Sequence, residues 1–194
     1  MDAEKRRFYH VCMQVWRKWH RFIQLLDSYS ISRKQRFKVL LYNDEIILDD
    51  ITIEIIKTSH DTSDSRSFIL RSEGKSIVYL TDTGFINQKY FNKLKNCNLY
   101  LFESNHDIYM EMNGTKDEAT KIRNIGDMGH LSNNDCTMYL NKLIGENTKV
   151  IMLVHISYHD NTEELAYKVN RENIDKKIPI LLAHEHELSE IIEV

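Results

Sequence analysis

The sequence of 194 residues is poor in residues that break or crosslink a chain. Six glycines and a single proline exclude collagen-like and other low-complexity classes. Three cysteines, Cys12, Cys97 and Cys136, are odd in number and far apart, so they indicate neither a disulfide framework nor a CxxC metal site, and we interpret them as reduced thiols partly in the core. No apolar run approaches the roughly 20 residues that span a bilayer, and the charged start is unlike a signal peptide. We therefore expect a cytoplasmic protein with no membrane partner.

What is present is a globular composition, 42% hydrophobic and 28% charged, with an uneven charge distribution. Residues 1–38 hold ten basic and three acidic residues, a net charge of +7, so the remaining 156 residues, with 16 basic and 26 acidic, carry −10. Apolar residues recur at helical spacing from Tyr9 to Leu26. We predict a basic helical segment over residues 1–36 and a domain over 37–194. The basic segment either binds an anionic partner such as nucleic acid or docks on the acidic surface of its own chain.

The rest of the chain alternates predicted strands with predicted helices. Ile51, Ile53 and Ile55 alternate with other residues in a strand with one buried face, and Glu73-Gly74 is typical of a hairpin turn. Further strands are expected at 67–71, 76–81, 99–103, 150–154 and 178–182, and helices at 87–94, 116–125, 133–143 and 162–170. This alternation predicts an α/β layered fold.

Five short polar segments follow apolar strands or begin helices, where functional groups gather in α/β proteins. They are Ser59-His60-Asp61, Thr81-Asp82-Thr83-Gly84, Glu103-Ser104-Asn105-His106-Asp107, Gly129-His130-Leu131-Ser132-Asn133 and His155-Ile156-Ser157. Taken singly, each segment fits a cap or a turn. Together, His, Asp and His at neighbouring strand ends can converge on a metal ion.

These five segments, in this order, resemble the metallo-β-lactamase-fold hydrolases, and in particular the small bacterial exodeoxyribonuclease-like group. The resemblance implies part of an αββα sandwich and a metal-dependent hydrolysis of phosphodiesters in DNA or RNA. It also implies that His60 ligates one ion, His155 ligates another and Asp82 bridges the two, with zinc or manganese as the metal.

The same resemblance suggests residues that handle the substrate. Asp82 and His130 would be catalytic, and His130 with Ser132 and Asn133, at a helix start, would hold a phosphate or its leaving group. Lys121 and Arg123 keep the basic spacing of the family and would add positive charge. Asp160, where the family tends to have asparagine, replaces an expected substrate contact.

The HxHxDH segment that supplies two ligands to each metal in this family is absent from the sequence. His10 and His20 lie ten residues apart on a predicted helix and cannot replace it. One HxH pair, His184 and His186, lacks the following Asp-His, and we interpret it as surface histidines. The strands of the first half of the sandwich are also expected to be missing, which predicts an apolar sheet face covered by the helix Tyr9–Leu26, by a complementing first-half chain or by a second copy.

Two functions therefore compete. The first is a metal-dependent phosphodiesterase or nuclease with a reduced metal site or a separate first half. The second is a non-catalytic scaffold that binds nucleic acid or a protein partner.

Overall fold

The computed structural model describes residues 45–48, 50–184 and 192. The predicted helix Tyr9–Leu26, the segment 1–36 and His186 lie outside these residues. The described elements are β1 (Glu45–Leu48), β2 (Ile51–Lys57), β3 (Arg66–Ser72), β4 (Lys75–Leu80), η1 (Gln88–Tyr90), α3 (Phe91–Leu94), β5 (Leu99–Glu103), α4 (Ile108–Asn113), α5 (Glu118–Ile125), α6 (Asn133–Leu143), β6 (Val150–Val154), α7 (Glu163–Asn173) and β7 (Ile180–Leu182).

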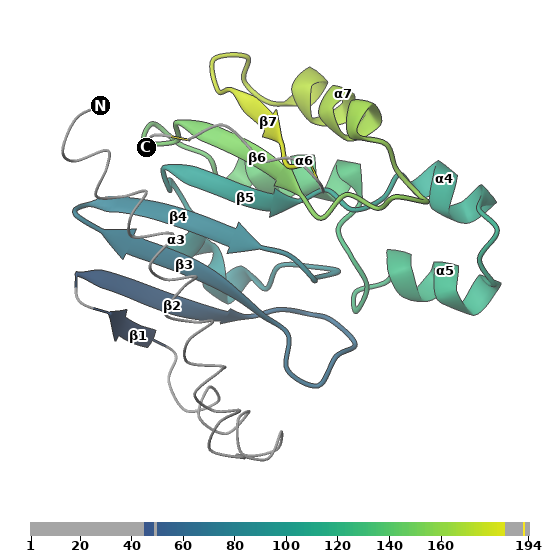
Figure 1. Ribbon diagram of the computed structural model, residues 1–194, viewed down its shortest axis with the longest axis horizontal. Helices are drawn as coiled ribbons and strands as arrows, with labels where there is room; N and C mark the ends of the chain where they lie inside the picture. Colours follow the sequence, from purple (N-terminus) through teal and green to yellow (C-terminus); the bar gives the residue numbers. More distant parts are fainter. Residues whose placement is uncertain (1–44, 49, 185–191, 193–194) are drawn as a thin grey trace.

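The seven strands form one sheet in the order of the sequence, β1 to β7. Strands β1 to β4 pair antiparallel, and β4 to β7 pair parallel. The turn between β3 and β4 has two residues, Glu73 and Gly74, both with positive φ (48° and 74°), which is the geometry that joins tightly paired strands. The strands β2, β4, β5 and β6 consequently end at the same edge of the sheet (Figure 1).

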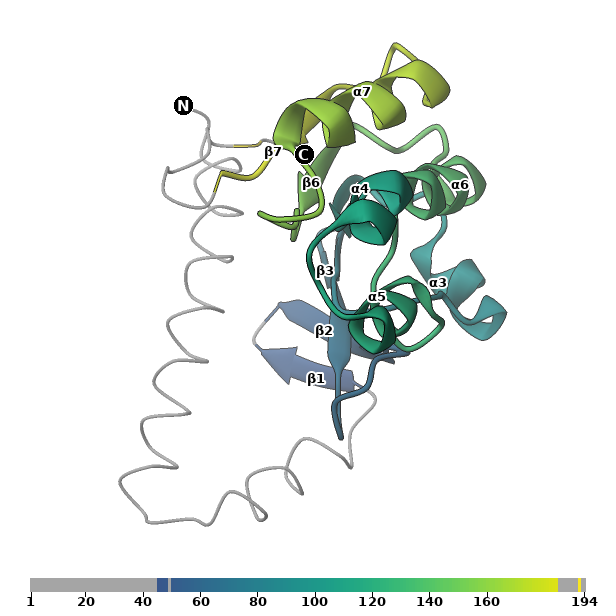
Figure 2. The ribbon, with the colours of Figure 1, turned by 90° about the vertical axis from the view of Figure 1, so that its right-hand side faces the viewer.

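The helices lie on one face of the sheet (Figure 2). On that face the strand register places five buried side chains in a row across β3 to β7: Ile69, Val78, Tyr100, Ile151 and Ile180. They belong to the main hydrophobic core together with Leu140 and Leu143 of α6 and Ala166 of α7. Burying a complete aliphatic side chain contributes about 1.5–3 kcal/mol, so this row fixes the register of the strands.

The opposite face of the sheet is also apolar. Its register row is Ile53, Leu70, Ile77, Leu99 and Val150, and the last three form a second, smaller core cluster. Among the described residues, no helix or strand packs on this face. The fold is therefore α/β, as the sequence predicts, and its seven strands form a single sheet. Among the described helices, none is long and apolar enough to cross a membrane.

Most predicted elements are confirmed. Strands β5 and β6 and helix α6 have the predicted bounds. Helix α5 begins at Glu118 rather than 116, because the Asp117 side chain accepts a hydrogen bond from Thr120 N and acts as the N-cap. Helix α7 extends to Asn173, and β7 begins one residue after Pro179. Helix α4 (Ile108–Asn113) was not predicted.

Candidate metal centre

Three of the polar segments meet at the carboxyl ends of neighbouring parallel strands. Glu103 is the last residue of β5, His155 directly follows β6, and Asp82 follows β4 by two residues. His130 reaches the same edge from the loop between α5 and α6. One ligand atom from each of these four residues lies within 4.8 Å of the others. The structure thus brings three predicted site residues, Asp82, His130 and His155, to one point.

Glu103 joins the two histidines. Its Oε1 accepts hydrogen bonds from the Nδ1 atoms of His130 and His155, both at 2.7 Å. Its Oε2 faces the backbone N–H groups of Thr83 (3.2 Å) and Leu131 (3.4 Å). The Glu103 side chain is completely buried, so all of its hydrogen-bonding capacity serves to hold these segments.

The shared acceptor fixes the tautomers of the two imidazoles. Because Nδ1 of His130 and of His155 donates to a carboxylate, the other ring nitrogen, Nε2, carries the lone pair in the neutral ring. Histidines that bind metals are oriented by the same kind of carboxylate partner. His155 Nε2 lies 3.7 Å from Asp82 Oδ1.

His60 is oriented in a similar way by a backbone carbonyl. Its Nδ1 lies 2.9 Å from Gly129 O, which can only accept, so Nε2 carries the lone pair of the neutral ring. That Nε2 lies 3.8 Å from Asp82 Oδ1. The ring centroids of His60 and His130 are 4.8 Å apart, and those of His130 and His155 are 5.2 Å apart. The third predicted ligand therefore adjoins the same cluster.

The distances around Asp82 fit a bound cation. Oδ1 faces His60 Nε2, His130 Nδ1 and His155 Nε2 at 3.7–4.0 Å, which is too long for hydrogen bonds. Two ligands of one ion, each bonded at about 2.1 Å, are about 3.4 Å apart in a tetrahedral site. Imidazole nitrogens with one carboxylate oxygen are a donor set that suits zinc and other divalent transition metals. Asp82 and His155 belong, with Glu103 and His130, to the four residues that could hold an ion, and His60 adjoins this group through Asp82.

Hydrogen bonds within the cluster shift the pKa values of Glu103 and His155. Burial of Glu103 by itself would raise its pKa, but the hydrogen bonds from His130 and His155 outweigh burial and lower that pKa below its ordinary value. The same hydrogen bond raises the pKa of His155 against the effect of partial burial, with Asp82 adding to the rise. Glu103 is therefore an anion held between two imidazoles.

The backbone at this edge adopts conformations that few residues tolerate. Asp82 and His155 both have φ of 55°, the left-handed region, which non-glycine residues occupy at an energetic cost and which is common at functional sites. Two glycines are required by close approach. A Cβ on Gly84 would meet Gly126 O at 2.3 Å, and one on Gly129 would meet Asn124 O at 2.1 Å. The Gly84 contact sets the loop that carries Asp82 against the turn after α5, and the Gly129 contact sets the segment that carries His130 against the end of α5.

Of the residues predicted to bind substrate, Ser132, Asn133 and Lys121 make contacts inside the protein, and Arg123 does not belong to this group. Ser132 is buried and caps α6 in a reciprocal capping box with Asp135, and Asn133 is buried and bonds to Ser104 and Asn161. The Nζ of Lys121 donates to Met112 O, and the structure does not bring this side chain to the cluster. Arg123 lies at the rim, where its guanidinium makes a bidentate pair with Asp61 at 2.6 Å. Asp61 Oδ1 is in turn 3.5 Å from His60 Nε2.

Asp160 and His106 are both buried, and neither belongs to the four-residue cluster. Asp160 pairs with Lys116, which also contacts Glu111, so this acidic residue serves an internal ion pair rather than a substrate. His106, in the third polar segment, has no hydrogen-bond partner on either ring nitrogen among the described residues, and burial lowers its pKa. Its ring is therefore neutral near pH 7. His184 lies elsewhere, paired with Glu163 of α7.

Glu103 is the residue of the cluster that sequence reasoning did not select. It stands in one of the quoted segments, but its partners, His130 and His155, lie 27 and 52 residues away. The available signal was a carboxylate at the end of the apolar run Leu99–Phe102, since an ionised side chain there must find partners.

Comparisons with known proteins identify the family of this chain. A family model described as "Beta-lactamase superfamily domain" matches residues 7–156. The chain therefore belongs to the metallo-β-lactamase superfamily of hydrolases.

Two curated relatives are exodeoxyribonucleases. The chain is 30% identical to exodeoxyribonuclease YycJ of Bacillus anthracis over 148 residues, which are 76% of this chain and 55% of that protein. It is 36% identical to exodeoxyribonuclease WalJ of Streptococcus pneumoniae serotype 2 over 118 residues, 61% of this chain and 44% of the relative. The chain thus spans about half the length of the curated relatives it matches.

Solved structures share the fold at low sequence identity. An isothiocyanate hydrolase from Delia radicum gut bacteria matches with a TM-score of 0.53 and 16% identity, over 80% of this chain and 63% of that one. The metallo-β-lactamase fold protein YhfI from Bacillus subtilis matches with a TM-score of 0.52 and 14% identity, over 72% and 49%. At such identities the match shows the fold alone.

Proposed function

We propose that this chain hydrolyses phosphodiester bonds in nucleic acid with a divalent metal, zinc or manganese, held by His60, Asp82 and His155. The observation that carries the proposal is Asp82 Oδ1, which faces three imidazoles that are each anchored by an internal acceptor. The exodeoxyribonuclease relatives support nucleic acid as the substrate. Such a metal supplies Lewis acidity and a water of lowered pKa.

The chain's own residues would orient the substrate and manage the proton. Glu103 holds His130 with Nδ1–H directed inward, which leaves Nε2 to contact a phosphate oxygen or the leaving oxygen. Ser132 and Asn133 support the segment that carries His130.

A second candidate is a scaffold that binds nucleic acid or a protein without hydrolysis. It rests on the small number of ligand residues identified, because His60, Asp82 and His155 are few for a centre that holds two ions. In a variant of the first proposal, a first-half polypeptide or a second copy of this chain completes the ligands.

Hydrolysis of a labelled single-stranded oligonucleotide, with Mn²⁺ or Zn²⁺ added, distinguishes the two candidate functions. The enzyme proposal predicts cleavage that Asp82→Asn and His155→Ala each reduce by about 100-fold or more, as expected when transition-state charge is no longer stabilised. Glu163→Gln, an exposed change on α7, should leave the rate unaltered. No cleavage with either metal, even with an added first-half polypeptide containing HxHxDH, would favour the scaffold.

A further inference from the structure

A cleft of about 370 Å³ opens beside the candidate metal centre. Its walls come from the end of β2, the loop that follows it and the segment between β4 and η1, which Figure 1 shows at one edge of the sheet. His60 belongs to both sites, since it lines the cleft and its Nε2 lies 3.8 Å from Asp82 Oδ1. A group bound in the cleft would therefore be a direct neighbour of a phosphodiester at the metal centre.

The charge of the cleft is positive in an acidic protein. Lys57 and Lys89 line it, and none of its lining residues is an aspartate or a glutamate, whereas the whole chain has a net charge of −3. The nearest acidic residues in the sequence are paired elsewhere, Asp61 with Arg123 and Asp64 with Arg66. The two lysines form no ion pair with a carboxylate among the described residues. Their charge is available to an anion.

The cleft also offers hydroxyl groups and aromatic rings. Five of its lining residues are serine or threonine, and the Thr58 hydroxyl is buried with no hydrogen-bond partner among the described residues. A buried hydroxyl without a partner costs free energy that a ligand oxygen would recover. Phe85 and Tyr90 supply apolar surface, and Lys89 Nζ lies 4.8 Å from the centre of the Tyr90 ring. Lysines and hydroxyls suit a phosphate, and aromatic rings suit a base.

We propose that this cleft binds the phosphorylated end nucleotide of a nucleic-acid strand and so directs the metal centre to strand ends. The proposal rests on the function proposed above and adds the substrate class: a strand that carries a terminal phosphate. The volume is that of a small-molecule site, enough for one nucleotide rather than for a duplex. Lys57 and Lys89 hold the phosphate, with the Thr58 hydroxyl as a further donor.

Binding can be measured without hydrolysis, so that failure of the cleft and failure of the metal centre are distinguishable. The probes are three fluorescent single-stranded hexanucleotides, with a 5′-phosphate, a 3′-phosphate or neither, titrated with the full chain in EDTA. We expect one phosphorylated probe to bind at least about fivefold tighter than the unphosphorylated one, as charge-assisted hydrogen bonds allow. Equal affinity for all three probes would contradict the proposal.

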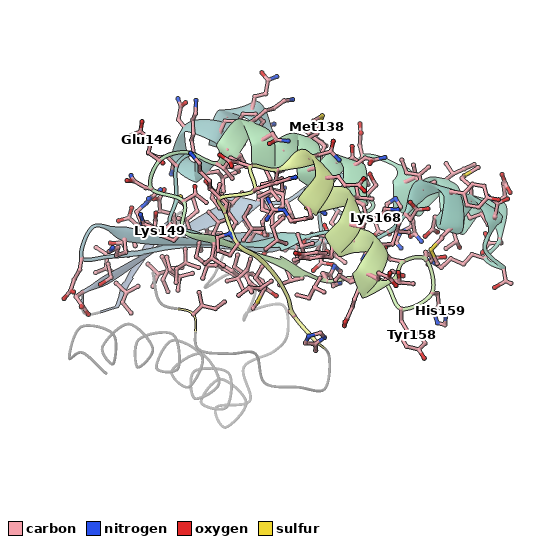
Figure 3. The ribbon with its side chains drawn as sticks, turned by 90° about the horizontal axis from the view of Figure 1, so that it is seen from above. Met138, Glu146, Lys149, Tyr158, His159 and Lys168 are labelled. Carbon is pink, nitrogen blue, oxygen red and sulfur yellow. The ribbon has the colours of Figure 1, made fainter. Side chains whose placement is uncertain are left out.

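Variants assign that preference to the cleft. Lys57→Ala with Lys89→Ala should abolish it, whereas Lys149→Ala with Lys168→Ala, two exposed lysines outside the cleft (labelled in Figure 3), should preserve it. Thr58→Val, which keeps the shape of the side chain, should weaken binding of the phosphorylated probe and leave binding of the unphosphorylated probe unchanged. Retention of the preference in the Lys57 and Lys89 variant, with an unchanged melting temperature, would overturn the assignment.

Competition separates a nucleotide site from a site for any phosphate. A deoxynucleoside monophosphate should displace the phosphorylated probe at a concentration about tenfold lower than inorganic phosphate, because the base adds stacking on the aromatic rings. Equal displacement by inorganic phosphate would show a simple anion site and refute the nucleotide part of the proposal.

Discussion

Glu103 is the residue on which the geometry of the candidate centre depends most. It is a charged side chain with no exposed surface, and it connects the ends of β5 and β6 with the loop before α6 through hydrogen bonds to two imidazoles and two backbone N–H groups. A buried carboxylate is costly unless all its oxygens are satisfied. Its position is therefore fixed by the same contacts that fix His130 and His155.

Glu103→Gln tests this role through the titration of His155. The present carboxylate raises the pKa of His155, so the stability that this pair contributes is complete below the unfolded pKa and is lost as pH rises through the higher folded pKa. In the variant the pKa of His155 should fall, and the pH at which this stability is lost should fall with it. NMR titration of the metal-free protein measures the shift. Glu163→Gln is the matched control, and an unchanged His155 pKa in Glu103→Gln would argue against the shared pair.

Among the elements, strands and helices with a regular apolar pattern were predictable and α4 was not. Strands β5 and β6 are continuous apolar runs, and α6 begins with a recognisable cap, so the sequence alone predicts their bounds. In α4 the pattern is reversed: Ile108, Tyr109 and Met112 are exposed, and the buried side chain is Glu111. Hydrophobic periodicity cannot indicate a helix that buries a carboxylate. Helix α4 is held instead by the contacts of Glu111 with Lys116 and Asn124, which come from other parts of the chain.

The same limit applies to the candidate site. Asp82, His130 and His155 follow strand ends or precede a helix, which the sequence shows directly. The internal use of Ser132, Asn133 and Lys121 depends on partners far along the chain, which no local pattern reveals.

The ion pair of Asp160 with Lys116 joins the turn after α4 to the loop after β6. Asp160 is almost fully buried and Lys116 partly so. Asp160→Ala leaves Lys116 with one carboxylate partner, and we expect a loss of about 1–3 kcal/mol in the free energy of unfolding. Burial opposes ionisation of Asp160, but Lys116 outweighs it and lowers the pKa. This stability is present above the unfolded pKa, about 3.9, and is lost as pH falls through the lower folded value.

Chemical denaturation at pH 7 and at pH 3 measures both effects. The deficit of Asp160→Ala relative to the natural sequence should be full at pH 7 and smaller at pH 3, whereas Glu146→Ala, an exposed change (Figure 3), should show none. A deficit that is independent of pH would contradict an ion pair.

The N-cap of α6 gives a second prediction for an element. The Ser132 hydroxyl accepts a hydrogen bond from Asp135 N at 3.1 Å, and the Asp135 carboxylate completes the box. Ser132→Ala should reduce the free energy of unfolding by about 1 kcal/mol, and Ser132→Thr should retain most of it. Thermal unfolding compares the two variants. Equal stability of alanine and threonine at this position would exclude the capping role.

For the whole molecule, the sheet divides the protein into a face covered by helices and an apolar face on which no described helix or strand packs (Figure 2). Among the described strands, β4, β5 and β6 bring the candidate metal centre together at their carboxyl ends. The charge is divided as well, with +7 on residues 1–38 and −10 on the rest.

The basic residues 1–38 predict nucleic-acid affinity that falls steeply with salt, because each neutralised phosphate releases counterions. Replacing Arg33, Lys34, Arg36 and Lys38 by glutamine should reduce the slope of log affinity against log salt for single-stranded DNA by about 0.7 for each phosphate that the variant no longer neutralises. Fluorescence anisotropy over roughly 50 to 200 mM salt, a range in which phosphate neutralisation is measurable, gives the slope. An affinity that salt does not change would reject this role.

The central claim is that His60, Asp82 and His155 hold a divalent metal, and direct measurement of bound metal tests it most closely. The chain is dialysed against trace zinc or manganese and analysed by isothermal titration and elemental analysis, beside His60→Ala, Asp82→Ala and His155→Ala, with His184→Ala as the control. We expect about one ion per chain, with weakened binding in each of the three variants and unchanged binding in the control. No bound metal in the natural sequence, or equal binding in all variants, would contradict it.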